Sequence, residues 1–166
     1  MRALMTGLIA ILASSVASAQ QPAAPAAGAV ARTMVSAADV SGLIAKAKAE
    51  RKDNQPLLAQ SMIQLAPYNV SLEYRAAVAN AAVHETEAEF FYVVDGSATL
   101  VTGGKLTSES RTNAANLTGS GIEGGVSRHV AKGDFIMVPE GTPHWFSAID
   151  GTVVLMSLHL PHAPQR

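Results

Sequence analysis

The stretch Gly133-Asp-Phe-Ile-Met-Val-Pro-Glu-Gly-Thr-Pro-His144 decides the fold of this chain. It opens on a Gly-Asp turn signal, and Phe135 to Val138 form a short apolar run typical of a buried strand. The segment from Pro139 to Pro143 then turns sharply, because proline fixes φ and glycine allows conformations that other residues resist. His144 follows at once, so the sequence predicts an imidazole held at the end of a stiff turn, as a metal ligand would need to be held.

A second stretch, His84-Glu-Thr-Glu-Ala-Glu89-Phe-Phe-Tyr-Val-Val-Asp95-Gly96, lies upstream. Phe90 to Val94 are predicted to form a strand, Asp95-Gly96 is a strong hairpin signal, and Ser97 to Thr102 are predicted to form the returning strand. Alternation along the first strand places Glu89 on the same face as Phe91 and Val93. An isolated buried carboxylate is costly, so this glutamate needs a charge partner or a metal.

The spacing G-x5-P-x-G-x2-H around His144 resembles the second signature motif of the cupin family. The upstream stretch resembles the first motif, G-x5-H-x-H-x(3,4)-E-x6-G, with His84 as the second histidine, then Glu89 and Gly96. It departs from that motif at Ala82, where the first histidine would stand, and at Ala76, where the leading glycine would stand. The resemblance implies an all-β fold, a cupin double-stranded β-helix or jelly-roll barrel with a short N-terminal helix, over residues 57–160.

Cupins usually present three histidines and one carboxylate at the mouth of the barrel, so the resemblance implies His84, Glu89 and His144 as metal ligands. Two imidazoles and a carboxylate with open positions suit a divalent ion such as Fe(II), Mn(II) or Zn(II). A shorter turn in the first motif would make His84 the first histidine and put Thr86 in place of the second. In either register one ligand is missing, and water, Glu85 or Glu87 would complete the shell. The alternative is a metal-free barrel in which the histidines and the glutamate bond to one another.

The remaining histidines of the domain carry weaker signals. His129 lies beside Arg128 on a predicted strand and is interpreted as an exposed strand residue. His159 alternates with Ser157 on the closing strand, where it either faces the cavity or is a satisfied histidine at a strand end. His162 lies in a polar tail, and no role is predicted for it.

The first nineteen residues are predicted to be a secretory signal peptide. Arg2 precedes an apolar run from Leu4 to Val16, and Ala17-Ser18-Ala19 forms an A-x-A cleavage site. The apolar run is too short for a comfortable transmembrane span. The chain is therefore expected to be periplasmic or secreted.

The charge and cysteine content of the chain exclude some classes of binding partner and some kinds of chemistry. Arg2 is the only charged residue in the predicted signal peptide, so cleavage leaves 11 of the 12 basic residues against 13 acidic ones. A net charge near −2 gives no footprint for nucleic acid or for an anionic membrane. The chain has no cysteine, which excludes disulfides and thiolate chemistry.

Between the signal peptide and the barrel, residues 20–35 are Ala/Pro-rich and predicted to be a linker. Residues 36–56 are predicted to form a helical segment, because Ser36 and Asp39 give a capping signal and apolar residues recur at helical spacing as far as Ala47. The helix is expected to pack outside the barrel or against a partner subunit. Residues 161–166 are predicted to be a C-terminal tail.

Short β segments fill the rest of the chain, including Leu57–Leu65, Tyr68–Tyr74, Val126–Val130 and Gly151–Leu160. Residues 105–127 are polar and rich in Ser, Thr, Asn and Gly. A segment of that length and composition predicts a mobile loop at the rim of the barrel.

Three functions fit these observations, because fold alone does not choose among them. The first is a metalloenzyme of oxygenase, isomerase or hydrolase type acting on a small molecule. The second is a non-catalytic module that binds or senses a sugar or an organic acid, with a degenerate metal site. The third is a structural or storage role, in which the apolar outer strands form a homodimer, as the sheets of cupins commonly do.

Overall fold

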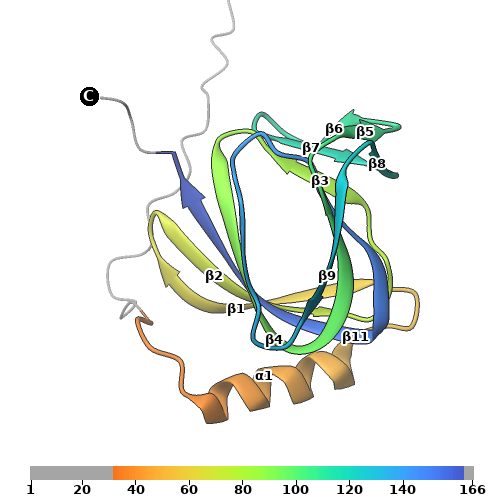
Figure 1. The fold of residues 1–166 in the computed structure, drawn as a ribbon. Coiled ribbons are helices and arrows are strands. Elements are labelled where there is room, and N and C mark those ends of the chain that lie inside the picture. Colours follow the sequence, from red (N-terminus) through yellow and green to blue (C-terminus); the bar gives the residue numbers. More distant parts are fainter. Residues whose placement is uncertain (1–31, 163–166) are drawn as a thin grey trace, which may run out of the picture. The chain divides into compact units, whose positions relative to one another are not determined.

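Two long strands, β4 (Glu87–Thr102) and β11 (His144–Pro161), form the frame of the molecule (Figure 1). The computed structural model describes residues 32–162. The other elements, in chain order, are α1 (Ala37–Glu50), β1 (Leu57–Leu65), β2 (Tyr68–Arg75), β3 (Ala81–His84), β5 (Lys105–Thr107), β6 (Ser110–Arg111), β7 (Asn116–Gly119), β8 (Gly121–Glu123), β9 (Val126–Ala131) and β10 (Phe135–Val138). The all-β barrel with a short N-terminal helix is confirmed.

The predicted hairpin at Asp95-Gly96 is wrong, because β4 runs through this point without reversing. Gly96 has a φ of +77° and bends the strand, and a Cβ added there would overlap the carbonyl oxygen of Thr152. The partner strand β11 bends at the same level, at Gly151, and stays paired with β4 on both sides of the bend. Keeping the pairing across the bend satisfies more backbone groups than ending the strand would.

The bend divides the barrel into two halves that share β4 and β11. On one side of it, β11 lies between β2 and the first half of β4, and β10 pairs with β4 at the edge. On the other side, β9 pairs with the second half of β4, and the beginning of β11 lies beside β3. Both ends of β4 and both ends of β11 therefore meet at the barrel end opposite the bend.

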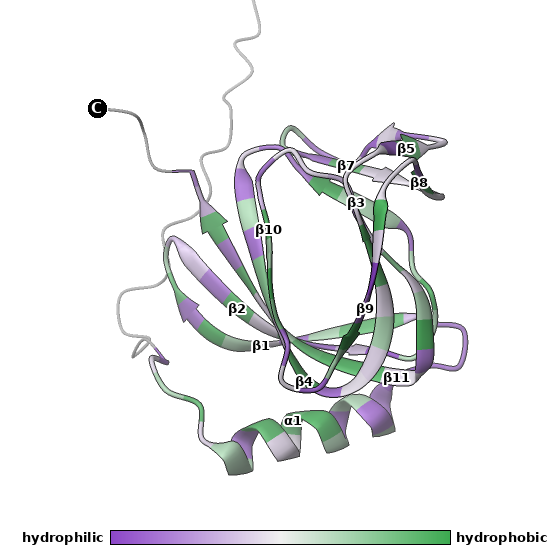
Figure 2. Ribbon diagram, in the orientation of Figure 1, coloured by the Kyte–Doolittle hydropathy of each residue, from purple (hydrophilic) through white to green (hydrophobic). Residues whose placement is uncertain are grey.

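The interior next to the bend is apolar. Phe91, Val93 and Leu155 are fully buried there, and they belong to a cluster completed by Ala98, Leu100, Val130, Val138, Phe146 and Val153. Phe91 and Val93 alternate with the outward-facing Phe90 and Tyr92, as the sequence predicted. Figure 2 shows the corresponding hydrophobic and hydrophilic bands along the barrel strands.

Helix α1 packs on the outer face of the barrel, which is one of the two positions expected from the sequence. Its capping box is present: the Ser36 hydroxyl accepts from the Asp39 amide at 3.2 Å, and the Asp39 carboxylate accepts from the Ser36 amide at 2.9 Å. The apolar side of the helix covers a second cluster, which includes Met62, Leu72 and Tyr74. Burial against these residues stabilises a helix too short to persist alone.

The prediction of a loop over residues 105–127 is also wrong. Strand β7 pairs with β3, β6 pairs with β7, and β5 and β8 form a separate two-stranded sheet. These strands are two to four residues long, so they carry no alternating apolar pattern that sequence reasoning would detect. Gly119 lets β7 approach the end of β5 closely, since a Cβ at this position would lie 2.7 Å from the Thr107 carbonyl oxygen. Backbone pairing, rather than apolar burial, orders the segment.

Some sequence predictions fall outside the described residues. The signal peptide (1–19), most of the linker (20–35) and the last residues of the tail (161–166) lie there. Within residues 32–162, no helix has the length and apolar character needed to cross a membrane.

Candidate metal centre

Four polar side chains gather inside the barrel at the end opposite the bend. His84 is the last residue of β3, Glu89 lies near the start of β4, and His144 is the first residue of β11. His159, near the end of β11, is directly opposite Glu89 in the strand register. A hydrogen bond of 2.7 Å from the Gly141 amide to the His84 carbonyl oxygen ties the turn before His144 to the end of β3. The structure thus brings together the three predicted residues and one more histidine.

Glu89 lies at the centre of this group and is only 3 % exposed. Its Oε2 is 3.2 Å from Nε2 of His84 and 3.1 Å from Nε2 of His144. Its Oε1 accepts a hydrogen bond of 2.6 Å from the Ser157 hydroxyl and lies 3.4 Å from Nε2 of His159. Three imidazoles therefore direct the same ring nitrogen at one buried carboxylate.

The opposite ring nitrogens of two histidines are held by acceptors. Nδ1 of His84 donates to Oδ1 of Asn116 at 2.7 Å, and Nδ1 of His144 donates to the carbonyl oxygen of Thr142 at 3.2 Å. In a neutral imidazole the other nitrogen, Nε2, then carries a lone pair. A lone pair facing a carboxylate oxygen at about 3 Å is repulsive unless a proton or a metal ion lies between them.

The charges in the cluster are strongly coupled. Burial disfavours the ionised form of Glu89, but the hydrogen bonds from His144 and His84 outweigh it, so the pKa of Glu89 is held well below its usual range. Burial likewise disfavours protonated His84, but the Glu89 and Asn116 hydrogen bonds outweigh it and raise the pKa of His84. Both shifts favour positive charge beside Glu89, which a bound cation would also supply.

The donor atoms fit a divalent ion. Nitrogen and oxygen ligands lie about 2.0–2.2 Å from zinc, so two ligands on one ion are roughly 3–3.5 Å apart. The distances from Glu89 to the three Nε2 atoms fall within that spacing. One ligand atom each from His84, Glu89 and His159 also lie within 4.8 Å of one another, whereas His144 is close to Glu89 but is not part of that group. This set of imidazoles and one carboxylate is chemically suited to Fe(II), Mn(II) or Zn(II).

His159 is the residue that sequence reasoning left open. It belongs to no motif, and alternation along β11 left two readings of its position. Its position follows from the antiparallel register of β11 with β4, which places the side chain opposite Glu89 on the same side of the sheet and is not encoded in the sequence of either strand. The other two histidines lie apart from the cluster: His129 is exposed, as predicted, and His162 pairs with Glu140 at 2.8 Å.

The two acidic residues considered as replacement ligands behave differently. Glu85 is turned away from the cluster and forms an exposed ion pair with Arg111, which lowers the pKa of Glu85. Glu87 lies beside the cluster, with Oε2 3.1 Å from Nδ1 of His159. Ala82 is on the same face of β3 as His84 and is opposite His144 in register, so a methyl group stands where the cupin motif has its first histidine.

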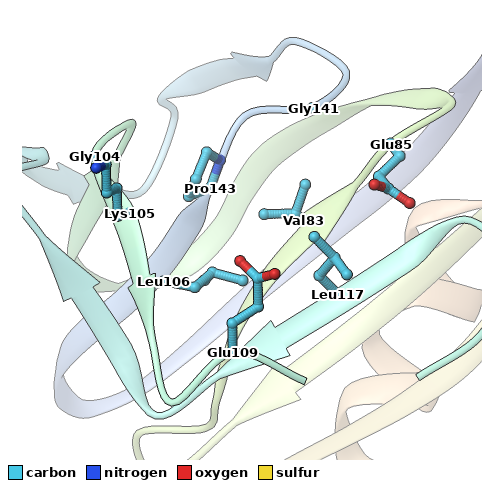
Figure 3. Close-up of a pocket in the computed structure, with 9 residues that line it drawn as sticks. All are labelled: Val83, Glu85, Gly104, Lys105, Leu106, Glu109, Leu117, Gly141 and Pro143. Carbon is cyan, nitrogen blue, oxygen red and sulfur yellow. The ribbon is translucent and has the colours of Figure 1, made fainter. Parts of the chain in front are cut away.

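A cavity of about 340 Å³ lies on the other side of β3. Val83, which alternates with His84, points into it together with Leu106 and Leu117, and the carboxylates of Glu85 and Glu109 stand at its edge (Figure 3). Because successive side chains of a strand point to opposite faces, this cavity and the histidine cluster are separated by β3 itself.

Comparisons with known proteins agree with the fold. A family model described as Cupin matches residues 49–165. The crystal structure of FeII HppE superposes with a TM-score of 0.50 at 15% identity, covering 66% of this chain and 54% of that one. KdgF from Halomonas sp. superposes with a TM-score of 0.49 at 16% identity, covering 69% of this chain and 86% of that one.

A cupin superfamily protein from Desulfitobacterium hafniense DCB-2 gives a TM-score of 0.47 at 16% identity, covering 68% of this chain and 83% of that one. The chain spans about half the length of HppE. A search among curated proteins gives no match. At 15% identity, the similarity to HppE supports the fold alone.

Proposed function

The chain belongs to the cupin family, and from this premise we propose that it binds one divalent metal ion inside the barrel through His84, Glu89 and His144. The main support is that the Nε2 atoms of His84 and His144 lie 3.2 and 3.1 Å from the same buried oxygen of Glu89. Asn116 and Thr142 hold the Nδ1 atoms of the two rings, which leaves both Nε2 atoms directed at Glu89.

Each residue of the proposed metal site would have its own role. Glu89 supplies the negative charge that offsets a divalent cation, and burial keeps water from competing for it. His84 is partly accessible, with 19 % of its side chain exposed, whereas His144 is 6 % exposed and closes the site from within. His159 is 28 % exposed, so a small molecule would approach from the side of His84 and His159.

We further propose that the site acts on a small molecule as a metalloenzyme of oxygenase, isomerase or hydrolase type. A bound divalent metal with open positions polarises a substrate oxygen or activates water or O₂. The similarity to FeII HppE makes iron the first metal to test, followed by manganese and zinc. The sugar- or acid-binding module without turnover is the alternative, and it becomes the favoured function if no metal binds.

The test is metal binding by the mature protein. Chelator-treated wild type should bind close to one equivalent of Fe(II), Mn(II) or Zn(II) by isothermal titration, with Fe(II) handled anaerobically. His144→Ala should bind at least about a hundredfold more weakly, since even an outer-shell change often costs 10–100-fold. His129→Ala, which removes an exposed histidine, is the matched control and should bind as wild type does.

If wild type binds none of the three metals, or if His144→Ala binds as tightly as wild type, the metal proposal fails and the non-catalytic module takes its place. In that case Glu89, with its Ser157 hydrogen bond and its imidazoles, serves as a fixed polar network in the barrel.

Export is a separate proposal. The mature protein would begin at Gln20, because a basic start, a short apolar run and an A-x-A site precede that residue. Mass spectrometry of protein from its native host should find Gln20, or its cyclised form, as the first residue. A mature pool that retains Met1 would contradict export by cleavage.

A further inference from the structure

We propose that His159 is a ligand of the same metal ion and takes the part that a histidine at position 82 has in the cupin motif. This inference rests on the metal binding proposed above. The ligand set would then be three imidazoles and one carboxylate, with two of the imidazoles supplied by β11.

The first support is the strand register. His159 is directly opposite Glu89 on the neighbouring strand, so the two side chains share a face of the sheet. Nε2 of His159 lies 3.4 Å from Oε1 of Glu89. The distance is close to those of His84 and His144 from the other carboxylate oxygen. The three imidazoles thus surround Glu89 from three strand segments.

The second support is the contact between the histidines themselves. The rings of His84 and His159 meet edge to face, with centroids 4.7 Å apart at 83°. Ligand atoms of His84, Glu89 and His159 lie within 4.8 Å of one another, which is close enough for one ion to bridge them after small ring rotations. The ring of His84 also lies near that of His144, with ring centroids 5.3 Å apart.

The third support is the missing ligand. Ala82 shares the inward face of β3 with His84, but its methyl group has no donor atom. The side chain at this position cannot contribute to a metal shell, so β3 supplies one imidazole instead of two. His159 adds an imidazole to the same cluster from the last strand. The number of nitrogen donors is thereby restored without the His-x-His pair.

Glu87 completes the arrangement. It is two residues before Glu89 on β4 and therefore on the same face, and its Oε2 is 3.1 Å from Nδ1 of His159. The contact is close enough for an ion pair but is not aligned as a hydrogen bond, and within the described residues Nδ1 is buried without another partner. Ligating histidines commonly turn this second nitrogen toward a carboxylate. A modest rotation of the His159 ring would allow Nδ1 to donate a hydrogen bond to Glu87 while Nε2 faces the metal.

The experiment compares four proteins, each stripped with chelator and titrated with Mn(II) and Zn(II). His159→Ala should bind more than about a hundredfold more weakly than wild type, a loss beyond the roughly 10–100-fold range of an outer-shell change. His162→Ala is the matched control, because His162 is near the same strand end but pairs with Glu140. It should bind as wild type does. Ala82→His combined with His159→Ala should recover most of the affinity.

A second readout does not depend on activity. Co(II) loaded into wild type and into the His159→Ala variant should give different visible absorption bands, because loss of a nitrogen ligand changes the ligand field. His159→Gln serves as a milder variant if the alanine variant unfolds. Circular dichroism and a melting curve establish that each variant is folded before titration.

The outcomes separate this inference from the metal proposal itself. If wild type binds no metal, the proposed function fails first. If wild type binds metal while His159→Ala keeps the same affinity and the same Co(II) spectrum, His159 is not a ligand, and the proposed function stands with three ligands. If His159→Ala weakens binding but the change at position 82 restores nothing, the replacement of that position by His159 is overturned.

Discussion

The two ends of the barrel interior differ in what they contain, although the same two strands build both. Near the bend, β4 and β11 turn Phe91, Val93 and Leu155 inward, and all three are fully buried. At the other end, the same alternation turns Glu89 and His159 inward. The apolar end gains stability from burial, whereas the polar end must overcome the cost of removing charge from water.

Along the same pair of strands, the residues that stabilise the fold are therefore distinct from the residues of the proposed site. Under the proposed function, side chains at the apolar end serve folding and side chains at the polar end serve metal binding. The predictions that follow test the separation, beginning with the largest expected change in the free energy of unfolding.

Phe91→Ala should lower the free energy of unfolding by about 3–5 kcal/mol, because it leaves a cavity in the fully buried cluster. The matched control is Phe135→Ala, since Phe135 is 71% exposed and its loss should cost less than about 1 kcal/mol. Urea unfolding followed by circular dichroism measures both. Similar losses for the two variants would mean that the apolar end does not hold the fold.

Gly96→Ala should cost about 2–4 kcal/mol, because the residue has a positive φ and the new methyl would overlap the Thr152 carbonyl oxygen. Gly151→Ala offers a close comparison. Gly151 has a φ of +76°, but nothing lies within 4 Å of its Cβ position, so the cost should be about 1–2 kcal/mol. Thermal melts of both variants would show whether the close approach of the bent strands matters beyond backbone conformation. Equal costs would show that it does not.

Metal at a hundred times its Kd should stabilise the wild-type protein by about 2.7 kcal/mol, since only the folded state binds it. For a chain of this size that corresponds to a rise of about 5–10 °C in Tm. The same addition should leave the Tm of His144→Ala almost unchanged. Scanning calorimetry with and without Zn(II) measures the difference, and a rise of the same size in both proteins would place the metal elsewhere.

Ser36→Ala should have the smallest effect, about 1 kcal/mol, because it removes the N-cap of α1 on the outer face of the barrel. Metal affinity should not change, since the helix packs against the outer cluster and not against the histidines. Asp53→Ala, a substitution at an exposed position beyond the helix, is a suitable control. A change in metal affinity would reveal coupling between helix and site.

Much of the fold could be predicted from local signals. The turn before His144 and the strand from Phe135 to Val138 were identified correctly, because proline, glycine and apolar runs act over a few residues. The prediction that this strand is buried was wrong, because Phe135 and Met137 face outward and are exposed. The hairpin at Asp95-Gly96 was predicted wrongly, because the same dipeptide also permits a bend when a partner strand bends with it. Pairing between distant strands decided that outcome, and a single strand's sequence does not encode it.

Prediction of the candidate site from sequence was limited in the same way, by contacts between distant strands. The motif spacing indicated His84, Glu89 and His144, and the structure brings them together. His159 was left undecided because its neighbour is seventy residues away in sequence and becomes adjacent only through the register of β11 with β4. The short strands from β5 to β8 were missed for a related reason, since they rest on backbone pairing and bury few apolar side chains.

The most direct test of a metal centre at the polar end is anomalous diffraction from crystals grown with Zn(II). We predict one strong peak inside the barrel, about 2.0–2.2 Å from a Glu89 carboxylate oxygen and from Nε2 of His84 and His144, the ordinary zinc–ligand distances. His159 should complete the shell at a similar distance. A peak only at surface groups such as His129 and Asp150, or no peak near Glu89, would contradict the account.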